Sequence, residues 1–221
     1  MHTESGKMEN TTFTKEDFEI FSIEGLDKRM SAIRKQLQPK FRILGHTFAE
    51  ELASELNQES LPIHIAQHLR RTKNAPKDTW MAIGGDNRGY KKYPHFQLGL
   101  YKSHIFIWLA FIDNPLHEEK MAIQIIEEPS LLFKVPNDYV VSWDHTKEQV
   151  TAINEADLLN GLIRWQTVKK GEFLIGRQIF ADDPLLIDPK ATQQFILDTF
   201  MELVPLYRQA YSVYEVQEGV S

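Results

Sequence analysis

Residues 60–104 gather side chains that could bind an anion. They include eight Lys or Arg against two Asp, a charge of +6, whereas the rest of the chain sums to −12. Clustered positive charge raises the local concentration of anions, and an arginine binds phosphate or carboxylate through two parallel hydrogen bonds. The segment therefore predicts a site for a small phosphorylated or carboxylated ligand. The alternative is a solvated surface whose lysines serve only solubility.

Two histidines of this segment, His64 and His68, stand four residues apart, a spacing that suits a metal site on a helix. The flanking Ile63 and Ile65 alternate with His64 as in a strand, where residues four apart are separated by about 13 Å. We therefore expect no metal site here. The run 84–89 (Gly-Gly-Asp-Asn-Arg-Gly) lacks the Lys-Ser/Thr that closes a phosphate-binding loop and is typical of a turn.

No motif identifies a catalytic residue or a cofactor. The chain has no cysteine, which excludes disulfides and thiolate chemistry, and it has no Gly-x-Ser-x-Gly motif of an acyl-transfer nucleophile. Asp144 and His145 could form an acid–base pair. Because neighbours on a strand point to opposite faces, a turn at a strand end is the more ordinary explanation for them.

Two further classes of function stay open beside the binding module. One is an enzyme that acts on an anionic substrate, with His95 or His145 as general acid–base, since imidazole titrates near neutral pH. The other is an interaction protein whose basic segment docks an acidic partner or RNA. The net charge of −6 and the isoelectric point near 5.8 argue against a generic nucleic-acid binder. The sequence indicates no oligomeric state.

Alternation over residues 93–101 predicts a strand that positions part of the anion site. His95 and Gln97 lie on one face, opposite an apolar face of Phe96, Leu98 and Leu100. Polar side chains on a covered sheet face need partners or a ligand. We expect His95 and Gln97 to line a concave site with Arg88 and Lys91 at its rim. Residues 79–83, 105–112, 139–143 and 173–179 predict further strands.

Helices are predicted before and after these strands. Thr14 and Asp17 form a capping box for a short helix that ends near residue 21. An apolar stripe over 26–37 predicts a second helix, which Pro39 interrupts and after which a third begins. Residues 116–126 predict another helix, and Asp188-Pro189 begins a C-terminal one. Asn154 with Asp157 starts a helix whose expected core face is Leu158, Leu159, Leu162 and Ile163.

These elements predict an α+β fold: a single compact domain with an antiparallel sheet meander flanked by N-terminal and C-terminal helices. We expect a disordered leader over 1–12, the domain over 13–212 and a polar tail over 213–221. The longest apolar run, 105–112, is far shorter than the roughly 20 residues that span a bilayer. With no cysteine and no signal-type apolar stretch, the sequence predicts a cytoplasmic protein without a membrane partner.

Several runs together resemble the YktB-like family of uncharacterised cytoplasmic proteins from Gram-positive bacteria. They are Phe18–Asp27, Pro76–Trp80, Arg88–Lys91 with Pro94–Gln97, Asp144-His145 and Lys169–Phe173. The resemblance spans about residues 13–211 and implies one compact α+β domain, with no assigned reaction. His64, His68, Arg70 and Arg71 match the family's His-x-x-x-His-x-Arg-Arg pattern, whereas Gly84-Gly85 departs from it. The candidate ligand-binding residues are therefore His64, His68, Arg70, Arg71, Arg88, Tyr90, Lys91, His95 and Gln97.

Overall fold

The computed structural model describes residues 11–112 and 115–219, so the predicted leader lies almost wholly outside the described residues. Within these described ranges, seven strands form an antiparallel sheet in the order β1-β2-β3-β4-β7-β5-β6. Their bounds are β1 Ile63–Ile65, β2 Asp78–Ile83, β3 His95–Tyr101, β4 His104–Phe111, β5 Val140–Ser142, β6 Thr151–Ala152 and β7 Phe173–Phe180.

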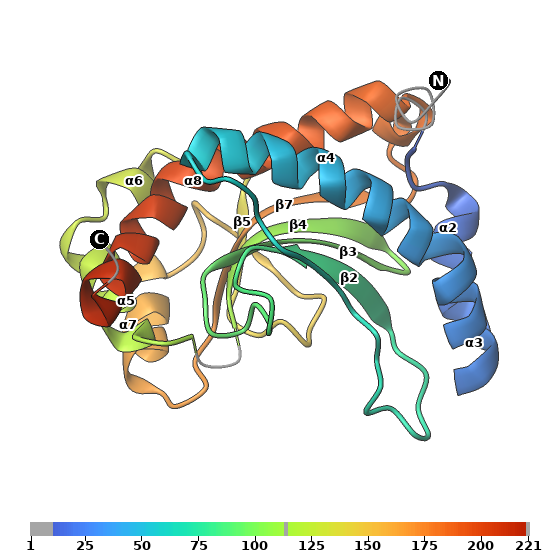
Figure 1. Cartoon of the computed structure of the whole chain (residues 1–221), viewed down its shortest axis with the longest axis horizontal. Coiled ribbons are helices and arrows are strands. Elements are labelled where there is room, and N and C mark those ends of the chain that lie inside the picture. The colour runs from blue at the N-terminus through green and yellow to red at the C-terminus, as the bar shows by residue number, and fades with distance from the viewer. Residues whose placement is uncertain (1–10, 113–114, 220–221) are drawn as a thin grey trace. The chain divides into compact units, whose positions relative to one another are not determined.

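Helices precede and follow the strands along the chain (Figure 1). The α-helices are α2 Lys15–Glu19, α3 Leu26–Ala32, α4 Gln38–Leu56, α5 Glu118–Glu127, α6 Ser130–Phe133, α7 Leu158–Thr167 and α8 Pro189–Glu218. Three short helical segments accompany them: η1 Ile20–Ser22, η2 Ile33–Leu37 and η3 Pro184–Ile187. The predicted α+β class is thus confirmed, and the polar tail expected from residue 213 continues α8 as far as Glu218.

Contacts within the chain divide it into two compact units, each described separately below. The first unit comprises Met1–Ile83, Gln97–Ile107 and Gln178–Asp198. The second unit comprises Gly84–Phe96, Trp108–Arg177 and Thr199–Ser221. No helix among the described residues combines the length and apolar character needed to cross a membrane.

In the first unit, α4 packs against β1 and β2 through the apolar face that its sequence predicts (Figure 1). Phe41, Leu44, Phe48 and Leu52 are all buried. Gly45 allows the close approach, because a Cβ at this position would lie 2.9 Å from the sulfur of Met81 and 3.1 Å from a methyl carbon of Ile63. This contact fixes one face of β1 against the helix.

The join between α3 and α4 differs from the prediction at Pro39. The helix does not break there: η2 is a π-helical turn that runs directly into α4, whose first turn contains the proline. A first-turn proline removes no hydrogen bond that the helix needs. The wider π turn shifts the register of the backbone hydrogen bonds. The helix can therefore continue past Pro39, which has no backbone N–H to donate.

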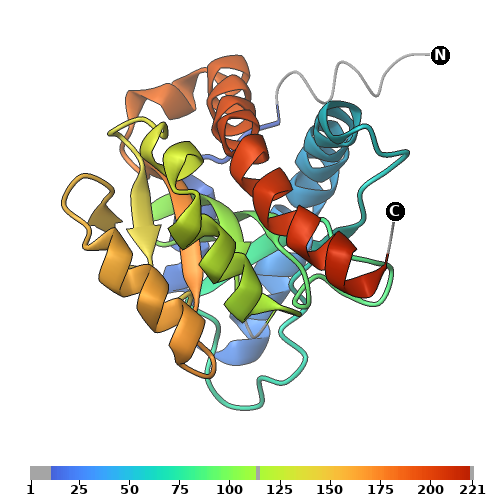
Figure 2. The same ribbon diagram turned by 90° about the vertical axis from the view of Figure 1, so that its left-hand side faces the viewer.

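In the second unit, α5 and α7 lie side by side (Figure 2). An aromatic cluster supports them, with ring centroids 4.9 Å apart for Phe111 and Trp165 and 5.3 Å apart for Trp143 and Phe173. Gly161 of α7 faces Trp143 so closely that a Cβ there would lie 2.1 Å from the indole.

The expected core face of α7 is partly wrong. Leu162 is buried as predicted, but Leu159 is 59% exposed and Ile163 is 40% exposed. The helix also begins later than expected, at Leu158, with Asp157 as its cap accepting from the Asn160 amide. The contact between Gly161 and Trp143 and the burial of Trp165 set the orientation of the helix, and a count of aliphatic residues could not reveal either.

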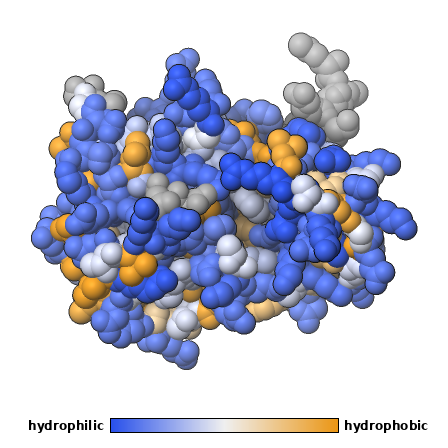
Figure 3. Space-filling view, turned by 90° about the horizontal axis from the view of Figure 1, so that it is seen from below, coloured by the Kyte–Doolittle hydropathy of each residue, from blue (hydrophilic) through white to orange (hydrophobic). Residues whose placement is uncertain are grey.

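Exposed hydrophobic side chains are few among the described residues, Ile187, Leu69 and Val216 being the most exposed. On the face shown in Figure 3, hydrophobic residues are scattered among hydrophilic ones and form no single patch. Specific binding must therefore be sought at defined side-chain clusters.

Candidate functional site

The chain turns directly after β5, and this turn presents Asp144 and His145 together. The Asp144 carboxylate accepts hydrogen bonds from the amide and the hydroxyl of Thr146, at 3.0 and 2.6 Å, and pairs with the Lys147 ammonium at 3.1 Å. These bonds, led by the Thr146 hydroxyl, lower the pKa of Asp144 to about 2. The predicted turn at this strand end is what removes the two residues from the alternation of a strand.

His145 is held by Glu172, which directly precedes β7. The ring Nδ1 lies 2.7 and 2.8 Å from the two carboxylate oxygens, and the backbone amide of His145 donates to Oε2 at 2.8 Å. Glu172 is only 8% exposed. A carboxylate that contacts both the ring and the backbone amide of His145 fixes the orientation of the imidazole.

Asp144, His145 and Glu172 each offer one ligand atom, and these three atoms lie within 4.8 Å of one another. Imidazole nitrogen and carboxylate oxygen are the ligands that zinc, manganese and related divalent cations take from proteins. The group therefore has the composition and the spacing of a three-ligand metal site. We call Asp144, His145, Glu172 and the neighbouring Glu118 the acid–histidine site.

Glu118, in the first turn of α5, adds a third carboxylate whose charge is poorly compensated. Its Oε2 is buried and has no hydrogen-bond partner among the described residues. Burial first, and the charge of Glu172 second, raise the pKa of Glu118 to about 7. The acid–histidine site is therefore rich in negative potential, and a bound cation would compensate it.

The nine residues predicted to bind an anion are divided between the two units. His64, His68, Arg70, Arg71 and Gln97 belong to the first unit, and Arg88, Tyr90, Lys91 and His95 belong to the second. His64 lies on β1 and Gln97 on β3, while Arg70 and Arg71 are exposed on the segment between β1 and β2.

His68 is part of the packing of the first unit. Its Nε2 lies 3.1 Å from the Thr79 hydroxyl, and its ring meets Trp80 edge-on at 5.5 Å. Burial first, and the charge of Arg71 second, lower the pKa of His68 to about 4. A histidine that stays neutral at pH 7 adds no positive charge to an anion site.

In the second unit, a loop held by hydrogen bonds to Asp86 carries the predicted basic residues. The Asp86 carboxylate accepts from the amides of Arg88 and Gly89, at 2.7 and 3.0 Å, and from the Tyr93 hydroxyl at 2.8 Å. Gly85 has φ +79°, and a Cβ there would lie 2.4 Å from the Gly89 carbonyl oxygen, so the turn requires glycine. Arg88 remains exposed on this loop.

The structure brings together one pair of the predicted residues here, Tyr90 and His95, whose rings are 4.6 Å apart. His95 is fully buried, with its Nδ1 2.8 Å from the Tyr93 carbonyl oxygen, and Gln97 is 3% exposed. Both side chains therefore lie on a covered sheet face, as their alternation predicts. Lys91 is exposed beside Tyr90.

Sequence reasoning missed Glu118 and Glu172. Glu172 lies within the run Lys169–Phe173 and His145 within Asp144-His145, and both runs were already notable as typical of the family. No spacing rule links residues 27 positions apart, so only the fold shows that one binds the other.

Comparison with known proteins gives a consistent result. A family model described as "Domain of unknown function (DUF1054)" matches residues 13–207. The chain is 44% identical to a UPF0637 protein of Exiguobacterium sibiricum, over 90% of this chain and 98% of the relative, and 47% identical to one of Enterococcus faecalis, over 90% and 97%. It is 42% identical to a UPF0637 protein of Listeria monocytogenes over 89% of this chain and 96% of the relative. The chain therefore belongs to the DUF1054 family of UPF0637 proteins, uncharacterised proteins with members in Gram-positive bacteria, with which the YktB-like resemblance agrees.

Proposed function

We propose that the protein binds a divalent metal ion at the acid–histidine site, through Asp144, His145 and Glu172. The observation that carries this proposal is the set of three ligand atoms within 4.8 Å of one another. Glu118 supports it, because a buried carboxylate oxygen without a partner lies in the field of Glu172. A cation bound nearby would lower the pKa of Glu118, and the charged carboxylate would in turn attract the cation.

Three protein ligands leave coordination positions for water or substrate, which is the arrangement of catalytic rather than structural metal sites. A metal ion with an open position attracts an anionic group and polarises it as a Lewis acid. The proposal therefore favours an enzyme acting on an anionic substrate. Lys147, which pairs with Asp144, is positioned to contact the anionic group of such a substrate.

The test is a titration of the metal-free protein with Co²⁺, followed by its visible absorption and by calorimetry. We expect one equivalent to bind and to give the intense bands of a low-symmetry site, with Asp144→Asn, which alters a ligand, weakening binding by at least about tenfold. Glu119→Gln, an exposed neighbour of Glu118, is the matched control and keeps the affinity. Equal affinities for wild type and Asp144→Asn, or no binding at all, contradict the proposal.

A second candidate function is anion binding by the 84–93 loop, with Arg88 and Lys91 as contacts. The Asp86-centred hydrogen bonds favour it, because they hold the loop in one conformation while Arg88 stays exposed. A ligand present at 100 times its dissociation constant stabilises a protein by about 2.7 kcal/mol. A thermal-shift panel of phosphate-bearing compounds should show this gain in wild type and lose it in Arg88→Ala. Retention of the full shift in the variant eliminates this loop.

If the first-unit residues bind an anion of their own, Arg71→Ala should reduce the thermal shift. His68, which burial keeps neutral, should not contribute to it at pH 7. A shift that Arg71→Ala leaves unchanged assigns the effect to the loop of the second unit alone. Neither result depends on the metal proposal, since both variants lie outside the acid–histidine site.

A further inference from the structure

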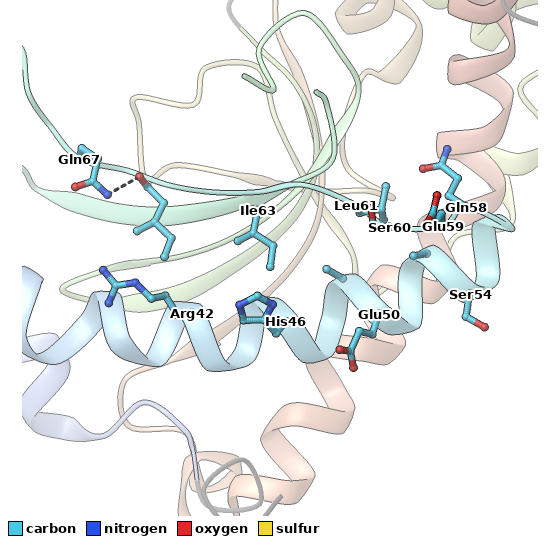
Figure 4. A pocket seen from close by; sticks show the side chains of 13 residues that line it. Arg42, His46, Glu50, Ser54, Gln58, Glu59, Ser60, Leu61, Ile63 and Gln67 are labelled. Carbon is cyan, nitrogen blue, oxygen red and sulfur yellow. Dashed lines mark hydrogen bonds between the residues drawn. The ribbon is translucent and has the colours of Figure 1, made fainter. Parts of the chain in front are cut away.

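A groove runs between α4 and β1 in the first unit, with a volume of about 900 Å³ (Figure 4). One side is a single face of α4, and the other is β1 with the segment that leads into it. Its lining includes charged residues of both signs, Arg42, Glu50 and Glu59, and the apolar residues Ile63 and Ile65. The volume falls within the range of specific ligand sites.

The strand that borders this groove is at an edge of the sheet. Among the residues that the structure describes, β2 is the only strand that pairs with β1. The amide of Ala66 donates to the Trp80 carbonyl at 2.9 Å, so Ala66 occupies a hydrogen-bonded position opposite β2. Hydrogen-bonded positions alternate along an antiparallel pair. The amides and carbonyls of Ile63 and Ile65 therefore point away from β2, toward the open edge.

These outward groups are suited to pair with an added strand. The Ile65 carbonyl already accepts a hydrogen bond, at 3.0 Å, from the exposed side chain of Gln67, a residue that can move aside (Figure 4). Strand addition to an exposed edge is a common mode of peptide recognition: main-chain bonds supply affinity and neighbouring pockets supply specificity. A helix beside the edge supplies those pockets here.

The lining of the groove specifies the chemistry of the occupant. Ala49 and Ala53 are small, and together with Ile63 they leave an apolar floor for aliphatic side chains. Arg42 lies near the Gln67 end of the groove, whereas Glu50 and Glu59 lie toward the other end (Figure 4). An occupant of complementary charge carries an acidic group at one end and a basic group at the other.

We infer that this groove binds an extended peptide segment of a partner protein, which adds a strand to β1. The segment carries an acid near Arg42, aliphatic residues over Ile63 and a base near Glu50 and Glu59. The β1 strand of a second copy is a poorer occupant, because it already turns Ile63 onto its own α4.

The test uses two fluorescent heptapeptides, Glu-Val-Thr-Val-Thr-Val-Lys and the same residues in reverse order, because a strand can add in either direction. We expect one order to bind with a dissociation constant below about 1 mM and the other to bind at least tenfold more weakly. Arg42→Glu should weaken binding of the preferred peptide about tenfold. Lys35→Glu, at another exposed helical position outside the groove, should leave it unchanged.

Methylation of the peptide nitrogens isolates strand addition without altering the protein. Only alternate amides of an added strand face β1. Methylation of one alternate set should therefore abolish binding, and methylation of the other set should preserve it. Equal effects of the two sets overturn strand addition, as does the absence of binding by both peptides.

Sedimentation at increasing protein concentration completes the test. A monomer whose peptide binding does not change with concentration supports a partner segment. Dimers that form with loss of peptide binding, and that Arg42→Glu dissociates, would falsify the inference in favour of a second copy. Because the groove lies in the first unit and the acid–histidine site in the second, Co²⁺ binding is measured separately for each variant.

Discussion

His68 in the first unit and Glu118 in the second show the same physical effect with opposite consequences. Burial is the leading cause at both residues, and it favours the neutral form in each case. For the base, the pKa falls to about 4; for the acid, it rises to about 7. His68 satisfies its ring nitrogen through Thr79, whereas Glu118 leaves a carboxylate oxygen without a partner among the described residues. His68 is used in packing, whereas Glu118 keeps a carboxylate oxygen that could bind a cation.

The comparison gives opposite dependences of stability on pH. The unfolded chain binds more protons than the folded one between the folded and unfolded pKa values of His68, so stability from this residue is lost as pH falls from about 6.5 to about 4. For Glu118 the folded chain binds more protons, so stability is lost as pH rises from about 4.5 to about 7. In the whole protein, the opposite pH dependences of stability from His68 and Glu118 partly cancel. A variant that removes one of the two groups shows the pH dependence of the other.

The largest effect is expected from Glu172→Ala, which removes the charged neighbour of Glu118. The ring and the amide of His145 lose their acceptor, and unsatisfied donors of this kind cost about 2–3 kcal/mol of unfolding free energy. Urea unfolding at pH 7 measures the loss. Glu119→Ala, on the exposed side of α5, should stay within about 0.5 kcal/mol of wild type.

Glu118→Gln should remove the acid from the comparison. The variant should gain about 1 kcal/mol over wild type at pH 8, because no charge is then buried near Glu172, and the two should converge at pH 4.5. Unfolding curves at the two pH values give the difference. A variant less stable than wild type at pH 8 would show that Glu118 is paired when charged, contrary to the proposed role.

His68→Asn removes the buried base. Its effect on the pH dependence of stability should be similar to that of Glu118→Gln or smaller. Asn tolerates the left-handed backbone at this position, where φ is +52°, so the backbone keeps its conformation. We expect the variant to lose less stability than wild type between pH 6.5 and 4, by about 1 kcal/mol. Parallel pH profiles for the two proteins would assign the acid sensitivity to other groups.

The smallest effect is expected at Asn57, the left-handed residue with φ 55° that ends α4. Asn57→Gly should raise the unfolding free energy by about 0.5 kcal/mol, because glycine adopts this conformation without a Cβ clash. The gain should be independent of pH, unlike those at His68 and Glu118. If the gain in unfolding free energy varied between pH 4 and 8, the end of α4 would be coupled to a titrating group, contrary to this prediction.

Local signals in the sequence predicted much of the fold. The capping box of Thr14 and Asp17 is present, with the Thr14 amide donating to Asp17 at 2.7 Å, and β4 is buried along its whole length, as its apolar run predicts. These features depend on residues within one element. The exposed face of α7 was mispredicted because the packing of Gly161 on Trp143 joins two elements.

The candidate site was less accessible to sequence reasoning for the same reason. Asp144 and His145 were visible as neighbours, but Glu172, which holds His145, precedes β7, and Glu118, whose pKa Glu172 raises, lies at the start of α5. The cationic segment was conspicuous in composition, yet charge density alone does not distinguish the neutral, packed His68 from the exposed Arg88. Burial, which decides between them, is a property of the fold.

The packing of Trp143 has an optical consequence. This indole, one of four in the chain, stacks on Phe173, and it directly precedes Asp144 in the sequence as Phe173 follows Glu172. Its emission should therefore respond to what the acid–histidine site holds, since Co²⁺ quenches a nearby excited indole by energy transfer. If the proposed site binds Co²⁺, Trp143→Phe should reduce this quenching while leaving the absorption bands of bound Co²⁺ in place.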